Sequence, residues 1–135
     1  MKRLFLFPGQ GSQTVGMGKF AIPLDPIVAK TFEEADVALK TPLSKMIFEG
    51  PEETLKETQN AQPAILTVSV AMGRLLKNKG IEPAIMAGHS LGEYSAVVMS
   101  GAMKFEDAVR IVRLRGMYMQ DAVPLGVGTM SAVLG

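Results

Sequence analysis

The chain has 135 residues, 47% of them hydrophobic, and its 14 basic and 13 acidic side chains leave a formal net charge of +1. A chain of this length can bury a hydrophobic core, and its basic residues form no run that would follow a nucleic-acid backbone. Because cysteine is absent, disulfides, thiolate catalysis and cysteine-ligated zinc are excluded. We therefore expect a globular, cytoplasmic protein with no metal site and no nucleic-acid partner.

The first predicted element is the apolar segment from Leu4 to Phe7, which the glycine-rich sequence Pro8 to Gln13 closes. Such a run predicts a strand buried on both faces and followed by a turn. It is too short for the apolar core of a signal peptide, and no stretch reaches the roughly 20 apolar residues of a membrane span. We expect neither export nor membrane association.

Helices are predicted for the next part of the chain. Asp25-Pro26 is typical of an N-cap followed by proline at the first helical position, and it predicts a helix to about Lys40. Thr41-Pro42 repeats this signal for a shorter helix that ends at Gly50. Apolar residues at helical spacing then predict a largely buried helix over residues 60–79.

The second half of the sequence repeats the order of strand, turn and helix. Residues 84–87 predict a strand, residues 93–100 and 105–123 predict helices, and residues 129–134 predict a further strand. Strands that alternate with long helices indicate a three-layer α/β fold with a mainly parallel sheet. Since nothing follows residues 129–134 to pair with them, we interpret the sequence as truncated.

The sequence Gly88-His89-Ser90-Leu91-Gly92 fits the G-x-S-x-G nucleophile elbow. In an elbow, the glycines permit a strained strand-to-helix turn that exposes the serine hydroxyl. The motif lies directly between a predicted strand and a predicted helix, so Ser90 is a candidate nucleophile. The alternative is a capping box, in which Ser90 and Glu93 only satisfy free amides at the start of a helix.

An acylated Ser90 would need hydrogen-bond donors for the oxyanion of its tetrahedral intermediate. The amide of Leu91, at the start of the following helix, is one candidate. The second is Gln10, because the turns after parallel strands gather at one edge of the sheet. The alternative for Pro8 to Gln13 is an ordinary turn; a phosphate-binding loop is excluded because no G-K-[ST] follows.

Arg115 falls within the apolar arc of its predicted helix, so its guanidinium is expected to face inward. Such a charge needs a partner, and a guanidinium can bind a carboxylate through two hydrogen bonds. The alternatives are an internal ion pair with Glu93 or Asp121, or snorkelling to solvent. His89, the single histidine, is adjacent to Ser90 and so poorly placed to take its proton, which means that the base must lie elsewhere.

Taken together, these residues resemble the malonyl-CoA:acyl carrier protein transacylases of fatty acid synthesis and the related acyltransferase domains of polyketide synthases. The resemblance rests on four motifs in the same order. They are Phe7-Pro8-Gly9-Gln10-Gly11-Ser12-Gln13, Gln62-Pro63-Ala64, Gly88-His89-Ser90-Leu91-Gly92-Glu93, and Arg115-Gly116 with Met119-Gln120.

The resemblance implies that Ser90 accepts a malonyl group from malonyl-CoA and passes it to the phosphopantetheine thiol of acyl carrier protein. Gln10 and Leu91 would donate backbone amides to the oxyanion, Arg115 would bind the malonyl carboxylate, and Gln62 would line the same pocket. Malonyl-CoA enters as a substrate, and no permanently bound cofactor is expected.

The resemblance also implies an α/β-hydrolase-like acyltransferase domain, with residues 1–126 as its N-terminal part. Residues 127–135 would begin a small ferredoxin-like subdomain, whose remainder and the catalytic histidine are missing from the sequence. Two alternatives stay open. One is a serine thioesterase or esterase of similar fold, and the other is a catalytically incompetent fragment.

Overall fold

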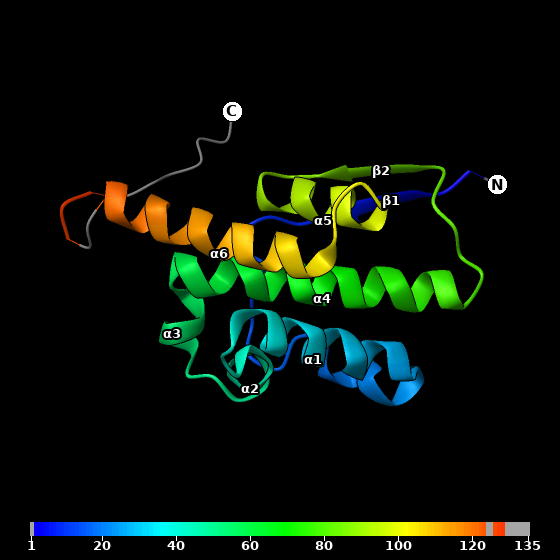
Figure 1. The fold of residues 1–135 in the computed structure, drawn as a ribbon, viewed down its shortest axis with the longest axis horizontal. Coiled ribbons are helices and arrows are strands. Elements are labelled where there is room, and N and C mark those ends of the chain that lie inside the picture. Colours follow the sequence, from blue (N-terminus) through cyan, green and yellow to red (C-terminus); the bar gives the residue numbers. More distant parts are fainter. Residues whose placement is uncertain (1, 124–125, 129–135) are drawn as a thin grey trace.

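The computed structural model describes residues 2–123 and 126–128. Within them the chain forms two strands, one 3-10 helix and six α-helices (Figure 1). In chain order these are β1 (Leu4–Phe7), η1 (Lys19–Leu24), α1 (Pro26–Leu39), α2 (Leu43–Glu49), α3 (Glu52–Lys56), α4 (Thr58–Asn78), β2 (Ile85–Gly88), α5 (Leu91–Met99) and α6 (Phe105–Ala122). None of the described helices has the length and apolarity needed to cross a membrane.

The two strands form a parallel sheet in which Leu4 pairs with Ile85 and Phe7 pairs with Gly88. The helices lie on one side of the strands in Figure 1. The other face is open, with Leu6 70% and Ile85 62% exposed. The prediction that the first strand is buried on both faces is therefore wrong for the described chain, because its helices supply only one covering layer. The described residues form a mostly helical α/β unit with a small parallel sheet.

Helix α4 is the centre of the hydrophobic core. Every residue from 60 to 67 is buried, and α1, α5 and α6 pack around the helix (Figure 1). Two glycines allow the close packing: a Cβ on Gly73 would lie 2.9 Å from the Met99 side chain, and one on Gly116 would lie 2.6 Å from the backbone of Gln59. The predicted largely buried helix is confirmed, and it begins two residues earlier than expected.

The helix-start signals were only partly correct. The carboxylate of Asp25 accepts a hydrogen bond of 3.0 Å from the Ile27 amide, so the predicted N-cap of α1 is confirmed. That amide also holds the pKa of Asp25 below its ordinary value. At α2, however, Pro42 itself is the N-cap, and Thr41 does not cap the helix. The strand predicted over residues 129–134 lies outside the described residues.

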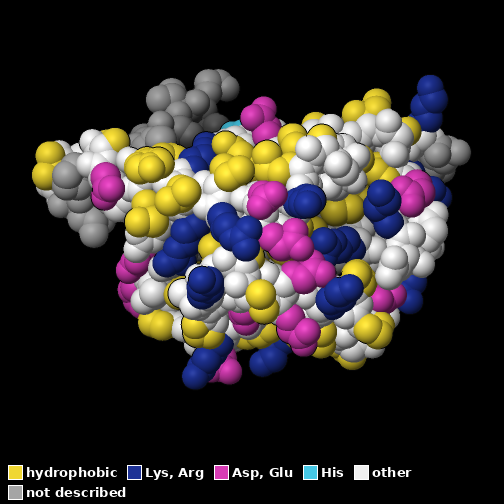
Figure 2. Space-filling view, in the orientation of Figure 1, with side chains coloured by type: hydrophobic (Ala, Val, Ile, Leu, Met, Phe, Trp, Pro, Cys, Tyr) yellow, Lys and Arg dark blue, Asp and Glu magenta, His cyan; other side chains and the backbone are white. Residues whose placement is uncertain are grey.

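Charges of both signs are mixed over the surface. Figure 2 shows acidic and basic side chains interspersed on the face that carries α1 and α2. Among the described residues, the best-buried ion pair joins Arg74 of α4 to Glu34 of α1 at 2.6 Å. This pair links the central helix to the layer below it.

Candidate active site

Ser90 occupies the turn between β2 and α5, as the elbow motif predicts. Its backbone has φ 51° and ψ −105°, a conformation that residues with a side chain rarely adopt. The residue is exposed, and its side chain makes no capping hydrogen bond to α5. The capping-box alternative is therefore wrong, and the strained turn presents the hydroxyl outward.

The two glycines of the motif are required by close backbone contacts. A Cβ on Gly88 would lie 2.0 Å from the carbonyl carbon of Gly92, and a Cβ on Gly92 would lie 2.1 Å from the carbonyl oxygen of Phe7. The elbow is thus packed tightly on itself and on the end of β1. This packing fixes the position of Ser90 at the carboxyl edge of the sheet.

Arg115 of α6 reaches this edge and contacts the serine. Its Nη2 donates a hydrogen bond of 3.0 Å to Ser90 Oγ, and its Nη1 donates one of 2.7 Å to Gln62 Oε1. Arg115 is half-buried, and none of the described carboxylates lies within ion-pair distance of it. The inward orientation is confirmed, whereas the ion pair with Glu93 or Asp121 is not formed.

Gln62 is fully buried in α4, and both ends of its amide are engaged. Its Oε1 accepts from Arg115, while its Nε2 donates to Met119 Sδ at 3.3 Å. The second contact orients the amide so that its oxygen faces the guanidinium. The structure thus brings together three residues predicted from the sequence, Ser90, Gln62 and Arg115.

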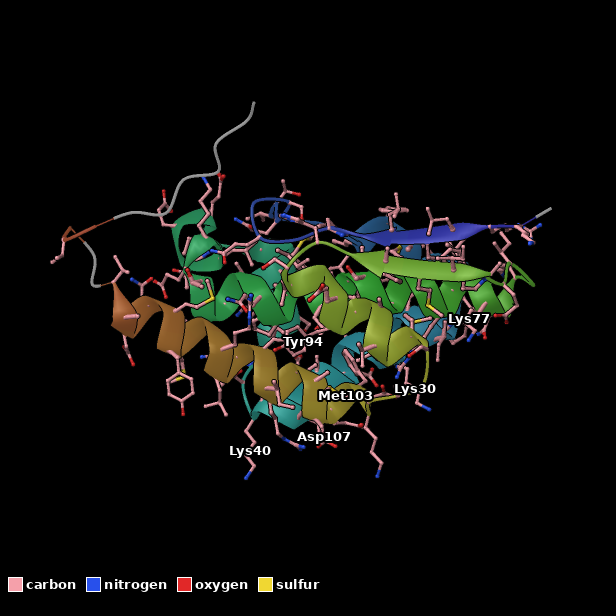
Figure 3. All side chains as sticks on the ribbon, turned by 90° about the horizontal axis from the view of Figure 1, so that it is seen from above. Lys30, Lys40, Lys77, Tyr94, Met103 and Asp107 are labelled. Carbon is pink, nitrogen blue, oxygen red and sulfur yellow. The ribbon has the colours of Figure 1, made fainter. Side chains whose placement is uncertain are left out.

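Tyr94 is a neighbour of this group that the sequence analysis missed. The Arg115 guanidinium carbon lies 5.8 Å from the centre of the Tyr94 ring. Tyr94 belongs to α5 and is labelled in Figure 3, beside α6. No local pattern indicates this contact, because it joins α5 to α6.

Gln10 lies in the turn after β1, next to the elbow. A Cβ on Gly9 would lie 2.7 Å from the carbonyl oxygen of His89, which shows how closely the two turns pack. The side chain of Gln10 is bound away from Ser90, since its Nε2 donates to Thr58 Oγ1 at 3.1 Å. The backbone amides of Gln10 and Leu91 have no acceptor in the described part of the chain.

The His89 side chain makes no hydrogen bond to the Ser90 hydroxyl in the described structure. The His89 backbone amide donates to the Phe7 carbonyl at 3.1 Å, and its carbonyl accepts from the Gly92 amide at 2.8 Å, so these backbone contacts hold the turn together. Over residues 2–123 and 126–128, Arg115 is the only side chain hydrogen-bonded to the Ser90 hydroxyl. That the base for Ser90 lies elsewhere stays a prediction.

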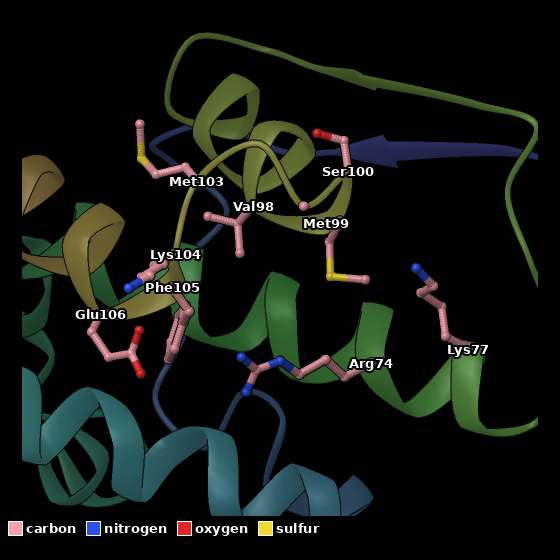
Figure 4. Close-up of a pocket in the computed structure, with 10 residues that line it drawn as sticks. Arg74, Lys77, Val98, Met99, Ser100, Met103, Lys104, Phe105 and Glu106 are labelled. Carbon is pink, nitrogen blue, oxygen red and sulfur yellow. The ribbon is translucent and has the colours of Figure 1, made fainter.

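A separate pocket lies where α4 meets the end of α5 and the start of α6 (Figure 4). Ser90, Gln62 and Arg115 do not line it. Arg74, which lines it, donates to Glu34 at 2.6 Å and to Thr31 at 3.0 Å, so its charge is already paired. No group of three or more potential metal ligands occurs among the described residues.

Comparison with known proteins defines the class to which this fold and site belong. Residues 4–134 match the acyl transferase domain family, and the chain belongs to that family. The resemblance inferred from the four motifs is thereby confirmed.

The relatives within the family are more specific. The chain is 55% identical over 134 residues to the malonyl CoA-acyl carrier protein transacylase of Bacillus subtilis (strain 168), covering 99% of this chain and 42% of that protein. It is 53% identical to the enzyme of the same name from Escherichia coli (strain K12), of which it covers 43%. The chain thus spans less than half the length of these curated relatives.

Solved structures agree with this comparison. The malonyl CoA-acyl carrier protein transacylase of Coxiella burnetii superimposes with a TM-score of 0.90 at 50% identity, over 93% of this chain and 40% of that one. A malonyl-transacylase solved in complex with a type II PKS acyl-carrier protein gives a TM-score of 0.88 at 47% identity, over 92% of this chain and 40% of that one.

Proposed function

We propose that this chain carries the acyl-accepting serine of a malonyl-CoA:acyl carrier protein transacylase. In that reaction the malonyl group of malonyl-CoA passes through a malonyl-Ser90 ester to the phosphopantetheine thiol of acyl carrier protein. The observation that carries the proposal is the pair of hydrogen bonds that places the Arg115 guanidinium between Gln62 and the Ser90 hydroxyl.

The first half of the reaction forms the ester. Ser90 Oγ attacks the thioester carbonyl, its proton passes to a base outside the described residues, and the carbonyl oxygen becomes an oxyanion. The free amides of Gln10 and Leu91 are the donors we assign to that oxyanion. The intermediate then collapses, the carbon–sulfur bond breaks, and the proton leaves with the thiol of CoA.

The second half reverses these steps with a different thiol. The carrier thiol gives its proton to the same base and attacks the ester carbonyl, and the same amides hold the new oxyanion. The base then passes that proton to Ser90 Oγ as the ester bond breaks. The solved complex of a relative with an acyl-carrier protein supports this choice of acceptor.

Arg115 supports malonyl as the transferred group. In malonyl-CoA a single CH₂ separates the free carboxylate from the reacting carbonyl, so a cation for that carboxylate must lie close to the nucleophile. Arg115 lies 3.0 Å from Ser90 Oγ and has no acidic partner among the described side chains. An acetyl group would leave this half-buried charge unpaired, which favours malonyl over acetyl. A neutral ester substrate would likewise need no cation here.

We extend the proposal to the whole fold. The uncovered apolar face of the sheet, with Leu4 52% and Leu6 70% exposed, supports a further layer and thus the three-layer, α/β-hydrolase-like acyltransferase fold. Residues 1–126 would be the first part of this domain, and residues 127–135 would open a small ferredoxin-like subdomain. We propose a cytoplasmic protein that uses malonyl-CoA as a substrate and holds no permanent cofactor.

The test measures where the malonyl group goes. The chain, alone and joined to the part of the Bacillus subtilis relative that follows the matched segment, is incubated with malonyl-CoA, with and without phosphopantetheinylated acyl carrier protein. We expect malonyl-carrier to form only with the carrier present, and Ser90→Ala to abolish it. Release of free malonate at the same rate in both cases would identify a thioesterase or esterase. No product from either protein would support the catalytically incompetent fragment.

A further inference from the structure

We propose that Tyr94 is a positioning residue that fixes the Arg115 guanidinium and thereby strengthens the selection of acyl groups that bear a carboxylate. This inference rests on the proposed function for its substrate and on the structure for its geometry. Nothing in the motif pattern assigns Tyr94 a role.

Three contacts surround the Arg115 guanidinium, and they come from three different parts of the chain. Gln62 of α4 and Ser90 of the elbow each accept a hydrogen bond from one Nη. The Tyr94 ring of α5 provides the third contact, with 5.8 Å between the guanidinium carbon and the ring centre. This distance is within the roughly 6 Å over which a cation and an aromatic face attract.

The ring contact differs chemically from the other two. Hydrogen bonds consume N–H donors, whereas a cation–π contact is electrostatic and consumes none. A guanidinium has five N–H donors, and the hydrogen bonds to Gln62 and Ser90 use one donor on each of two nitrogens. Tyr94 therefore holds Arg115 without using the donors that a substrate carboxylate needs.

Two of the three other arginines of α4 and α6 show what this arrangement avoids. The third, Arg113, donates to the neutral Asn60 Oδ1 at 3.0 Å. Arg74 also faces a ring, that of Phe105 at 5.0 Å, but it is paired with Glu34 at 2.6 Å. Arg110 is paired with Asp107 at 3.2 Å. An acid paired with Arg115 in the same way would neutralise the charge that Arg115 offers to a ligand. Arg115 instead combines a ring with neutral acceptors in the described part of the chain.

The proposal assigns the effect to the ring and not to the phenol hydroxyl. Within the described residues, the Tyr94 hydroxyl makes no hydrogen bond to another side chain or to the backbone. Tyr94→Phe keeps the ring, and Tyr94→Leu removes it at similar apolar volume. Tyr118→Leu is the matched control, because Tyr118 is the other of the two tyrosines and is 69% exposed on α6.

The first measurement needs no reaction. In the arginine-labelled 135-residue chain, the ring current of Tyr94 should displace the side-chain NMR signals of Arg115. These signals are assigned by their disappearance in Arg115→Lys. We expect Tyr94→Phe and Tyr118→Leu to keep this displacement and Tyr94→Leu to remove it. A signal unchanged in a folded Tyr94→Leu chain would overturn the positioning role.

The second measurement addresses selection. The malonyl-CoA concentration that gives half-maximal acylation of Ser90 should rise about two- to fivefold in Tyr94→Leu, as expected for losing a partly exposed cation–π contact. The half-maximal concentration of acetyl-CoA should not change in Tyr94→Leu. In Tyr94→Phe, the half-maximal concentration of malonyl-CoA should match that of the unmodified chain. An equal rise of the half-maximal concentration for both thioesters in Tyr94→Leu would overturn the proposal. A rise for malonyl-CoA in Tyr94→Phe would also overturn it. If the NMR displacement is present but neither the chain nor the protein extended with the Bacillus subtilis segment accepts a malonyl group, the proposed function and the selection fail, while the positioning stands.

Discussion

At the scale of a single residue, the contacts of Gln62 support the proposal that Arg115 binds a carboxylate. Its buried amide accepts one N–H of the guanidinium without adding charge, and its contact with Met119 keeps the oxygen in place. A neutral partner of this kind orients a cation and leaves the positive charge available. The same reasoning applies to the ring of Tyr94.

Replacing this amide by an acid should disable the carboxylate site. In Gln62→Glu, a carboxylate of similar size lies at the Gln62 position, 2.7 Å from Arg115 Nη1, and pairs with it. We expect malonylation of Ser90 to fall at least about tenfold, as for losing a charge-assisted hydrogen bond, with acetylation unchanged. Initial rates with the two thioesters provide the measurement. Unchanged malonylation in a folded Gln62→Glu chain would show that Arg115 does not bind the carboxylate.

The sequence was informative for residues whose role is encoded locally. Ser90 could be predicted from its neighbours Gly88 and Gly92, and the inward side of Arg115 from helical periodicity. Gln62 came only from the family resemblance, and Tyr94 was missed, because each meets Arg115 through tertiary packing. The hydrogen bond between Gln62 and Arg115 spans 53 residues, and no local pattern encodes such a contact.

At the scale of elements, the approach of α6 to α4 depends on Gly116. Glycine usually weakens a helix interior, and replacing it by alanine ordinarily adds about 1 kcal/mol of stability. Here the new Cβ would lie 2.6 Å from the Gln59 Cα and 2.7 Å from the Thr58 carbonyl oxygen. Since both are backbone atoms, the helices would have to separate.

We therefore expect Gly116→Ala to lower the free energy of unfolding by about 1 to 3 kcal/mol, the usual range for overpacking. Met117→Ala is the control, because Met117 is on the same helix and 40% exposed, and its change should stay within about 0.5 kcal/mol. Urea titration followed by circular dichroism gives both values. A Gly116→Ala chain that gains stability would contradict the close packing of α4 and α6.

The elements that could be predicted are those with a repeated signal. The apolar periodicity of α4 and α6 extends over several turns, and both helices appear within two residues of their expected starts. Helix α3 and the 3-10 helix η1 were missed, since five or six residues are too few for a period to show. Burial of β1 was overestimated because an apolar run does not reveal which layers are present to cover it.

At the scale of the whole molecule, the core and the open sheet face should respond differently to the same mutation. Leu66 is fully buried in α4, whereas Leu6 is 70% exposed on β1. Leu66→Ala should cost about 2 to 5 kcal/mol of unfolding free energy. Leu6→Ala should cost less than about 0.5 kcal/mol. Urea unfolding of both variants in the 135-residue chain tests this contrast. A large loss in Leu6→Ala would show that the sheet face is covered in solution.

The most direct test of the central claim is the mass of the chain after incubation with malonyl-CoA, followed by peptide mapping. We predict one malonyl group on Ser90, none in Ser90→Ala, and at least about tenfold less in Arg115→Ala. The same comparison applies to the protein extended with the Bacillus subtilis segment, in which a base can be supplied. An adduct that persists in Ser90→Ala, or no adduct in either protein, would contradict the assignment of Ser90 and Arg115 to malonyl transfer.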